Sequence, residues 1–162
     1  MYTGCMPPIT TFLTFNDRAE EAANFYVSVF PNSRIGKFAR YGAAMPDLAG
    51  KVMTVEFDLD GKPFVALNGG PQFHFTEGVS LMVTCDTQAE IDHYWSKLGE
   101  GGQPMACGWL KDRFGLAWQI TPAMLMPLVT DPDPTVAKRA MEVMMTMVKF
   151  DIAALRRGCG LE

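Results

Sequence analysis

Two segments of the chain repeat each other after a shift of 69 residues, and this repeat restricts the possible folds more than any other feature. Residues 9–15 and 79–85 are both β-rich runs, and each leads through a polar turn into an amphipathic helix pattern. The shift superposes four pairs: Asp17 and Asp86, Glu21 and Glu90, Phe25 and Tyr94, and Tyr26 and Trp95. Two strand–helix units with matching turns and matching aromatic pairs indicate an internal duplication.

Both helices begin at a pattern that is typical of a capping box. Asp17 precedes Glu20 by three residues, and Thr87 precedes Glu90 by the same spacing. In a capping box the first side chain accepts a hydrogen bond from a backbone amide of the first turn, and the acidic side chain reaches back. We therefore expect Asp17 and Thr87 to be the N-caps of the two helices.

Each helix is followed by three further strand patterns. In the first half these are residues 33–40, 52–59 and 63–68, and in the second half residues 103–106, 109–111 and 116–121. Residues 52–59 alternate cleanly between apolar and polar positions, as a strand with one buried face does. The sequence therefore predicts an α+β fold in one compact domain: two βαβββ modules, residues 9–70 and 78–122, followed by a C-terminal helical extension, residues 123–158.

The C-terminal extension carries an apolar stripe that is rich in methionine. A short apolar turn over residues 124–129 leads to a helix that is expected to start near Thr135. The stripe of this helix consists of Met141, Met144, Met145, Val148, Ile152 and Leu155. Such stripes are usually core or subunit interface, and less often an adaptable binding surface. We expect a homodimer.

Composition excludes several classes of partner. The net charge is −4 and the lysines and arginines are scattered, so no basic surface for nucleic acid is expected. No apolar run reaches the roughly 18–20 residues that cross a bilayer, and the first eight residues lack the pattern of a secretory signal. The four cysteines, at positions 5, 85, 107 and 159, form no close pair. A cytoplasmic protein with reduced thiols is therefore predicted.

The most distinctive run is C-G-W-L-K-D-R-F-G-L-A-W-Q-I-T-P, residues 107–122. It reads as a β-hairpin around the D-R-F-G turn. Alternation in its second strand places Leu116, Trp118 and Ile120 on one face. The opposite face carries Ala117, Gln119 and Thr121, which are small or polar. The first face is expected to be core, and the second to be the wall of a pocket.

Four stretches of the chain resemble the PhnB-like family of the vicinal-oxygen-chelate superfamily, which also contains glyoxalases, bleomycin-resistance proteins and dioxygenases. They are residues 19–33, 67–75, 92–98 and 107–122, and the resemblance extends over about 9–157. Members of this family often carry the name demethylubiquinone 3-methyltransferase. The resemblance implies that each module curls its sheet into half of a funnel, and that the two halves face each other across a pocket.

Metal-dependent members of the superfamily hold a divalent ion at four inward positions, on the first and last strands of each module. Alignment on the helices places these positions at Thr11, at Ala66 or its neighbour Asn68, at Ser80 and at Gln119. An alanine and two hydroxyls neither balance the charge of a dication nor fill its coordination shell. The sequence therefore predicts no metal and no other cofactor.

The resemblance and the strand patterns together define a predicted pocket. Its residues are Thr11, Leu13, Phe64, Ala66, Asn68, Phe73, Ser80, Met82, Trp109 and Gln119. We predict that the protein binds a small, planar, oxygenated molecule in this pocket between the paired modules, without a metal.

An alternative is an enzyme that acts on a quinone-like or α-keto substrate. Its base would be Glu56, a carboxylate within a strand, or His74, a histidine after the turn at residues 67–71. Both have plainer interpretations, as a solvated strand residue and a loop histidine. A methyltransferase is less favoured, because the glycine-rich turn at 99–102 follows a helix pattern rather than a strand. A purely structural dimer would leave Gln119 unexplained.

Overall fold

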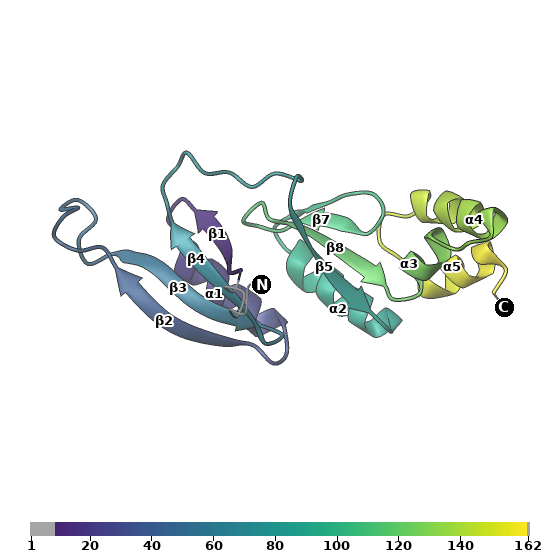
Figure 1. Cartoon of the computed structure of the whole chain (residues 1–162), viewed down its shortest axis with the longest axis horizontal. Helices are drawn as coiled ribbons and strands as arrows, with labels where there is room; N and C mark the ends of the chain where they lie inside the picture. Colours follow the sequence, from purple (N-terminus) through teal and green to yellow (C-terminus); the bar gives the residue numbers. More distant parts are fainter. Residues whose placement is uncertain (1–8, 162) are drawn as a thin grey trace, which may run out of the picture. The chain divides into compact units, whose positions relative to one another are not determined.

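The computed structural model describes residues 9–161 of the chain and divides it into two compact units, Met1–His74 and Phe75–Glu162. Each unit contains one four-stranded sheet with its own helix, and the C-terminal helices belong to the second unit (Figure 1). Within residues 9–161, no helix has the length and apolar character needed to cross a membrane. The predicted domain boundaries within the chain stay a prediction.

The first unit has the predicted order of strand, helix and three strands. The elements are β1 (Thr11–Phe15), α1 (Ala19–Val29), β2 (Arg34–Arg40), β3 (Val52–Leu59) and β4 (Lys62–Asn68). The strand order in the sheet is β1-β4-β3-β2, with β1 parallel to β4 and the other neighbours antiparallel. The first strand of the module therefore lies beside its last strand.

The second unit repeats this arrangement. Its elements are β5 (Ser80–Cys85), α2 (Gln88–Gly99), β6 (Gln103–Pro104), β7 (Trp109–Lys111) and β8 (Ala117–Pro122). The strand order is β5-β8-β7-β6, and β5 is parallel to β8. The predicted α+β class, with two βαβββ modules and a C-terminal helical extension, is confirmed.

In both units the helix covers one face of the sheet and forms the core there. In the first unit, the ring of Tyr26 on α1 lies 6.3 Å from the ring of Phe57 on β3, and both side chains are buried. In the second unit, Ile91 and Leu98 of α2 are buried, as are the residues of β7 and β8 on the same side: Leu110, Trp118 and Ile120. The opposite face of each sheet is not covered by that helix.

The first strands of the two modules match after a shift of 70 residues rather than 69. A shift of 69 superposes Leu13 on Met82, yet Leu13 is 4% exposed and Met82 is 51% exposed. A shift of 70 superposes Phe15 on Cys85, and both are buried and end their strands. The helices keep the shift of 69, so the two elements of the repeat follow different offsets.

The difference arises in the link between strand and helix. Residues 16–18 connect β1 to α1, whereas only residues 86–87 connect β5 to α2. The extra residue does not disturb the helix, but a slip of one residue along a strand moves every side chain to the other face. The counterpart of Ser80 in the first module is therefore Thr10 rather than Thr11.

The two helices begin differently. The capping box of α2 is confirmed: the Thr87 side chain accepts from the Glu90 amide, and the Glu90 carboxylate accepts from the Thr87 amide. The prediction that Asp17 caps α1 is wrong, because the longer link displaces Asp17 from the N-cap position to the residue before it. The N-cap is Arg18, and its side chain makes no capping bond.

The missing cap of α1 is supplied by a distant amide side chain. Asn68, at the end of β4, accepts a hydrogen bond from the backbone amide of Ala19 at 2.8 Å. Its Nδ2 donates to the carbonyl oxygen of Val52 at 3.0 Å. One side chain therefore connects the start of α1, the end of β4 and the start of β3.

Replacing Asn68 by alanine is expected to lower the free energy of unfolding by about 1–2 kcal/mol, because loss of a cap costs about 1 kcal/mol and the Val52 carbonyl also loses a donor. Urea denaturation followed by circular dichroism measures this change. The matched control is Asp17→Ala, which removes an exposed side chain at the other candidate position and is expected to shift stability by less than about 0.5 kcal/mol. Equal effects would contradict the assignment.

The C-terminal extension contains three helices: α3 (Leu125–Val129), α4 (Pro134–Met145) and α5 (Ile152–Cys159). The prediction of one continuous helix from about Thr135 is wrong. The chain leaves the helix after Met145, because the carbonyls of Met147 and Val148 accept hydrogen bonds from the amides of Cys107 and Gly108. Asp151 then caps α5 by accepting from the Ala154 amide at 2.8 Å.

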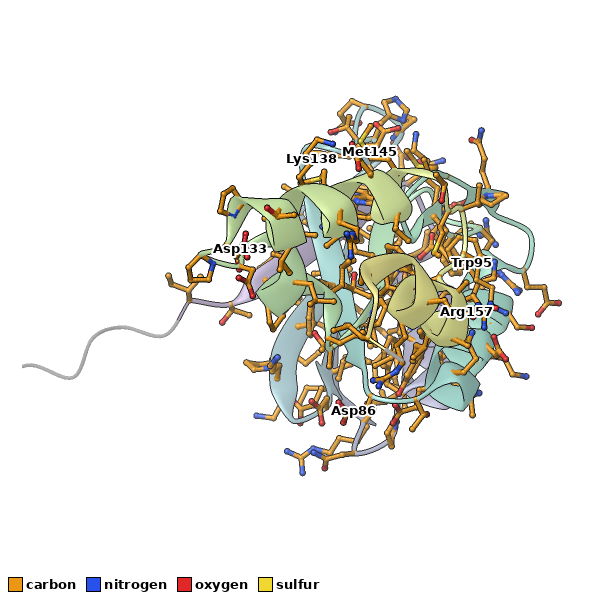
Figure 2. The ribbon with its side chains drawn as sticks, turned by 90° about the vertical axis from the view of Figure 1, so that its right-hand side faces the viewer. Asp86, Trp95, Asp133, Lys138, Met145 and Arg157 are labelled. Carbon is orange, nitrogen blue, oxygen red and sulfur yellow. The ribbon has the colours of Figure 1, made fainter. Side chains whose placement is uncertain are left out.

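The break divides the predicted methionine stripe. Leu155 is fully buried, whereas Met145 is 67% exposed and Val148 is 51% exposed. Figure 2 shows Lys138 and Met145 on α4 and Arg157 on α5, with their side chains on the surface of this helical layer. The stripe is therefore core only at its C-terminal end, and its α4 part is an exposed apolar surface.

Candidate functional site

The candidate site is the face of the second sheet that α2 does not cover. Strand pairing places residues of β5, β8 and β7 in rows across this face. One row consists of Ser80, Ala117 and Lys111, and the next consists of Met82, Gln119 and Trp109. Four of the ten predicted pocket residues, Ser80, Met82, Trp109 and Gln119, therefore lie together on one surface.

Gln119 and Ser80 are joined by a hydrogen bond on this face. The Gln119 Nε2 donates to Ser80 Oγ at 2.8 Å, and both residues are half-buried. This geometry leaves the Gln119 carbonyl oxygen as an acceptor, and leaves the second amide hydrogen and the Ser80 hydroxyl hydrogen as donors. The pair therefore presents donors and an acceptor in fixed positions on an otherwise apolar row.

The residues beside Gln119 are large and apolar. Met82, its partner on β5, is 51% exposed, and Trp109, its partner on β7, is half-buried. An indole ring offers a flat surface on which a planar molecule stacks, and a methionine side chain adapts its shape to a neighbour. The row therefore combines a polar centre with two apolar flanks.

The loop before β7 fixes the position of Trp109. Cys107 and Gly108 both have positive φ, 57° and 76°. A Cβ atom at Gly108 would lie 2.3 Å from the Phe150 ring and 2.7 Å from the Ile120 carbonyl oxygen. Only glycine fits this close approach, and the C-terminal segment packs directly on the loop.

Lys111 lies in the same row as Ser80 and forms an ion pair with Glu77, in the turn before β5. This hydrogen bond to the Lys111 ammonium holds the pKa of Glu77 below its usual range. The sequence analysis missed both residues. Alternation from Trp109 to Lys111 was the signal that would have placed the lysine on the pocket face.

Asp112 organises the D-R-F-G turn from inside the protein. Its side chain is 3% exposed, and Oδ2 accepts from the Trp118 indole nitrogen at 2.8 Å. Oδ1 accepts from the amides of Phe114 and Leu116 at 2.8 and 3.1 Å. The carboxylate thus satisfies a buried indole and the two amides of the turn.

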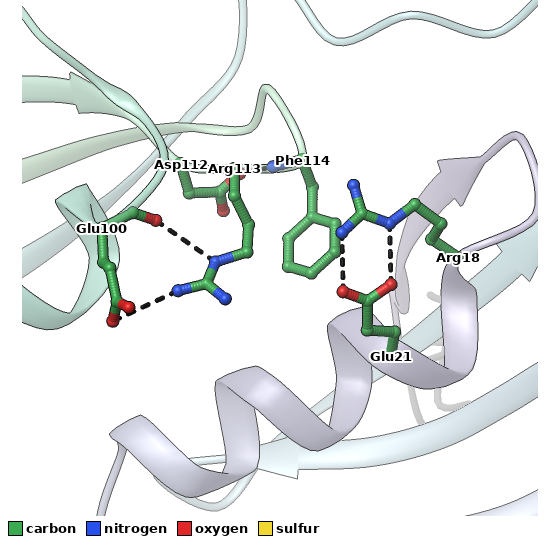
Figure 3. A network of polar contacts seen from close by, with 6 residues as sticks. All are labelled: Arg18, Glu21, Glu100, Asp112, Arg113 and Phe114. Atoms are coloured by element: carbon green, nitrogen blue, oxygen red, sulfur yellow. Dashed lines mark hydrogen bonds and ion pairs between the residues drawn. The ribbon is translucent and has the colours of Figure 1, made fainter.

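Two ion pairs occupy the surface near the helix ends (Figure 3). In the second unit, Arg113 donates to the Glu100 carbonyl oxygen at 3.2 Å and lies 3.3 Å from its carboxylate. This contact joins the turn to the end of α2. In the first unit, both oxygens of Glu21 accept from Arg18, at 2.6 and 2.7 Å, in the first turn of α1.

The predicted pocket residues of the first module lie on the other face of their sheet. Register and burial place five of them on the side that α1 covers: Thr11, Leu13, Phe64, Ala66 and Asn68. Leu13 and Ala66 are buried there. The cause is the one-residue difference between the modules, which places Thr11 out of phase with Ser80. Asn68 also lines a cavity of about 610 Å³ at the end of β4. The role of these residues in ligand binding stays a prediction.

The uncovered face of the first sheet contains a surface cavity of about 410 Å³. The exposed carboxylate of Glu56 lines it, so this candidate base lies on the uncovered face. Arg34 and Asp58, 2.8 Å apart in an ion pair, also line it. The counterpart of Gln119 on this face is Val65, because Val65 pairs with Phe12 as Gln119 pairs with Met82.

Phe73 and His74 follow the first sheet in a segment without regular structure, and both are exposed. A Cβ atom at Gly69 would lie 2.9 Å from the Phe73 ring, so the ring rests against this glycine. The structure therefore places His74 at the surface rather than beside a buried carboxylate. Its catalytic role stays a prediction.

The positions that the resemblance assigns to a metal are Thr11, Ala66 or Asn68, Ser80 and Gln119. In the first module, strand register places Val65 opposite Phe12, as Gln119 is opposite Met82 in the second. None carries a charged or imidazole ligand, and valine offers no donor atom, so these residues do not fit a divalent cation. Within residues 9–161, His, Cys, Asp and Glu side chains form no group of three that could hold a metal ion.

Two of the three described cysteines are withdrawn from solvent. Cys85 and Cys159 are buried, and Cys107 is half-buried. Burial raises the pKa of the Cys85 thiol to about 11, which leaves it protonated at neutral pH. Cys5 lies outside the described residues.

The chain matches one family model and is similar to several solved structures. The family model of 3-demethylubiquinone-9 3-methyltransferase matches residues 7–121. The PhnB protein of Bacillus cereus is 39% identical over 72% of this chain and 100% of its own, with a TM-score of 0.66. Protein PA1353 of Pseudomonas aeruginosa is 23% identical over 70% of this chain and 96% of its own, with a TM-score of 0.60, and shows the fold alone. A comparison with curated proteins found no match.

These findings confirm the resemblance that the four sequence stretches indicated. The match spans both βαβββ modules and ends at Thr121, within β8. Helices α3, α4 and α5 therefore lie beyond the part of the chain that defines the family. The chain belongs to the 3-demethylubiquinone-9 3-methyltransferase family, which includes the PhnB protein of Bacillus cereus.

Proposed function

We propose that the protein binds a small, planar, oxygenated molecule without a metal, on the uncovered face of the second sheet. The observation that carries this proposal is the hydrogen-bonded pair of Gln119 and Ser80, set between Met82 and Trp109. A sheet face that only met solvent or other core would not need a fixed amide between two large apolar side chains. This arrangement is typical of ligand sites, which are mostly apolar with a few placed polar groups.

The hydrogen-bonding and aromatic side chains of this face indicate the chemistry of the ligand. The free acceptor and donors of Gln119 and Ser80 match a carbonyl or hydroxyl group, and the indole of Trp109 matches a flat conjugated ring. No base lies in the same two rows, which contain Ser80, Ala117, Lys111, Met82, Gln119 and Trp109. Lys111 forms an ion pair with Glu77. The face therefore supports binding better than proton abstraction.

An enzyme remains the second candidate, because Glu56 lies exposed in the 410 Å³ cavity of the first sheet. In this function Glu56 acts as a general base on a quinone-like or α-keto substrate. The methyltransferase activity in the family description is less favoured. The glycine-rich turn at 99–102 follows α2 rather than a strand, so it does not form the strand–turn–helix unit that binds a nucleotide cofactor.

We also propose that the protein is a homodimer. The exposed apolar surface of Met141, Met145 and Val148 supports this proposal. Native mass spectrometry compared with the denatured mass reports the number of chains, any bound small molecule and any metal in one measurement. We expect two chains and no divalent ion. A stoichiometric divalent ion would contradict the metal-free function, and a monomer would contradict the dimer.

Replacing Gln119 by leucine is expected to weaken binding of a neutral probe, 4-hydroxybenzamide, by about tenfold or more. The variant removes one or two hydrogen bonds of about 1 kcal/mol each, and about 1.4 kcal/mol corresponds to a factor of ten in affinity. Ligand-detected NMR titration measures the dissociation constants. Thr84→Val is the matched control, because Thr84 is exposed on the same strand face, one position beyond Met82 in the alternation. Unchanged affinity of the Gln119 variant would contradict the site.

A further inference from the structure

We infer that the ligand carries an anionic group, of the size and charge of a carboxylate, which Lys111 binds in exchange for Glu77. This inference rests on the proposed function, because it adds a charge to the molecule that Gln119 and Ser80 hold. It identifies the ligand class as a planar oxo- or hydroxy-carboxylate. In the form of the protein described above, Glu77 occupies the place of that carboxylate.

The first argument is position. Lys111 and Ser80 flank Ala117 in one row of the sheet, so their side chains leave the same face. Lys111 is the diagonal neighbour of Gln119, and such neighbours lie about 7–8 Å apart. This distance is close to the length of a benzene ring with one substituent. A single flat molecule can therefore meet the ammonium at one end and the amide at the other.

The second argument is the shape of the floor between these groups. Ala117, between Ser80 and Lys111, has only a methyl group, the smallest side chain of the two rows, and it is fully buried under its neighbours. Trp109 stands beside Lys111 on β7, two residues away and on the same face. The ring of a bound molecule would lie over Ala117, with the indole at its side.

The third argument is charge. The chain as a whole carries a net charge of −4, which disfavours the approach of an anion. An anionic ligand therefore needs a cation at the site itself. On the uncovered face of the second sheet, Lys111 is the one cation among the described strand residues. The Lys111 side chain is 28% exposed, so it is partly withdrawn from water and needs an anionic partner.

The fourth argument is the nature of the partner that Lys111 now has. Glu77 lies in a turn between the end of the first unit and β5, and its side chain is 47% exposed. An ion pair this accessible to water contributes little net stability, so its exchange for another carboxylate costs little. Lys111, by contrast, is the last residue of β7 and pairs with Ala117 of β8 beside the turn. The lysine is therefore the permanent member of the pair and the glutamate the replaceable one.

The experiment compares 4-hydroxybenzoate with 4-hydroxybenzamide, which differ in the charge of one group. Dissociation constants are measured by NMR titration at pH 7 for the unmodified chain and two variants. We expect the unmodified chain to prefer the benzoate. Glu77→Gln is expected to strengthen benzoate binding by about threefold to tenfold, with benzamide binding unchanged. Lys111→Met is expected to abolish the preference for the benzoate, a loss of about tenfold.

The matched control is the other ion pair of the same unit, between Arg113 and Glu100, which is joined to α2 rather than to the site face. Glu100→Gln is expected to leave the affinity for both probes unchanged. Thermal unfolding of each variant verifies the fold. If Lys111→Met fails to fold, Glu77→Gln alone tests the inference. The Glu77 side chain is exposed, so this variant is expected to fold, and the inference predicts that it binds 4-hydroxybenzoate more tightly.

Two negative outcomes are distinguishable. If 4-hydroxybenzamide binds and depends on Gln119, but Glu77→Gln does not change benzoate binding, the exchange at Lys111 is overturned while the proposed function stands. If neither probe binds the unmodified chain, and Gln119→Leu changes nothing, the proposed function fails and the inference fails with it. Benzoate binding that increases in both Glu77→Gln and Glu100→Gln would show a general charge effect and would also overturn the inference.

Discussion

Gly108→Ala is expected to lower the free energy of unfolding by about 3 kcal/mol or more. The new Cβ atom would lie 2.3 Å from Cε2 of Phe150 and 2.7 Å from the carbonyl oxygen of Ile120. Overpacking of a core costs about 1–3 kcal/mol, and an alanine at positive φ adds about 1–2 kcal/mol.

The structure around Gly108 offers little room for relaxation. Phe150 is 1% exposed, so its ring cannot turn outwards without leaving the core. The Gly108 amide donates to the Val148 carbonyl at 2.7 Å, and its carbonyl accepts from the Ile120 amide at 2.8 Å. Ile120 is therefore bonded to Gly108 itself, and the Phe150 carbonyl accepts a hydrogen bond from Gln88 of α2, so neither neighbour can retreat freely.

Gly115→Ala is the matched control for this prediction. Gly115 also has a positive φ, 88°, but a Cβ atom there would meet no heavy atom within 4 Å. Gly115→Ala is therefore expected to lower the free energy of unfolding only by the strain of an alanine at positive φ, about 1–2 kcal/mol. Urea denaturation of the two variants separates strain from steric overlap, and equal losses in both would mean that the C-terminal segment does not pack on Gly108.

Asp112→Ala is expected to have a comparable effect, about 3–5 kcal/mol. The carboxylate is buried and accepts three hydrogen bonds, from the Trp118 indole and from the Phe114 and Leu116 amides. Alanine leaves these donors without the acceptor, and a buried donor without a partner costs about 1–3 kcal/mol. Loss of the turn would also release Lys111 and Gln119 from their common face.

A double-mutant cycle with Trp118→Phe tests the indole contact. Phenylalanine has no N–H group, so Asp112→Ala should cost less in the Trp118→Phe background than in the original chain. A hydrogen bond to a charged acceptor is worth about 1.5–3 kcal/mol, and we expect a coupling free energy of that size. Additive losses would show that the carboxylate stabilises the turn without help from the indole. Chemical denaturation provides all four free energies.

The strands and helices could be predicted from the sequence because local signals agreed with the core. Alternation in residues 52–59 corresponds to β3, and the pattern at Thr87 and Glu90 forms a capping box. The same local signal failed at Asp17. There, an amide from the far end of β4 occupies the capping role, and a contact between residues 19 and 68 leaves no local pattern.

The face on which each candidate residue lies could be predicted in one module and not in the other, for a physical reason. Gln119 was assigned to its face by alternation within its own strand, which needs no alignment. Thr11 was assigned by transfer from Ser80 through the helices, and the link between strand and helix has one more residue in the first module. A helix tolerates this difference through its loop, but a strand has a period of two and changes face.

The tail was mispredicted because its apolar spacing continues through a break. Residues from Met141 to Leu155 keep helical spacing, yet the chain turns at residues 146–151. The cause lies about forty residues earlier, in the amides of Cys107 and Gly108, which bind the carbonyls of the turn. Competition between a helix and a distant loop for the same carbonyls is not visible in periodicity.

The hydrogen bonds between the loop and the tail show what the C-terminal segment contributes to the rest of the second unit. The family match ends at residue 121, and the acceptors for the Cys107 and Gly108 amides, Met147 and Val148, lie beyond it. A chain cut after residue 122 would lose both acceptors, and the two amides would have to bond to water instead. The C-terminal segment therefore completes the backbone hydrogen bonding of the loop that precedes Trp109.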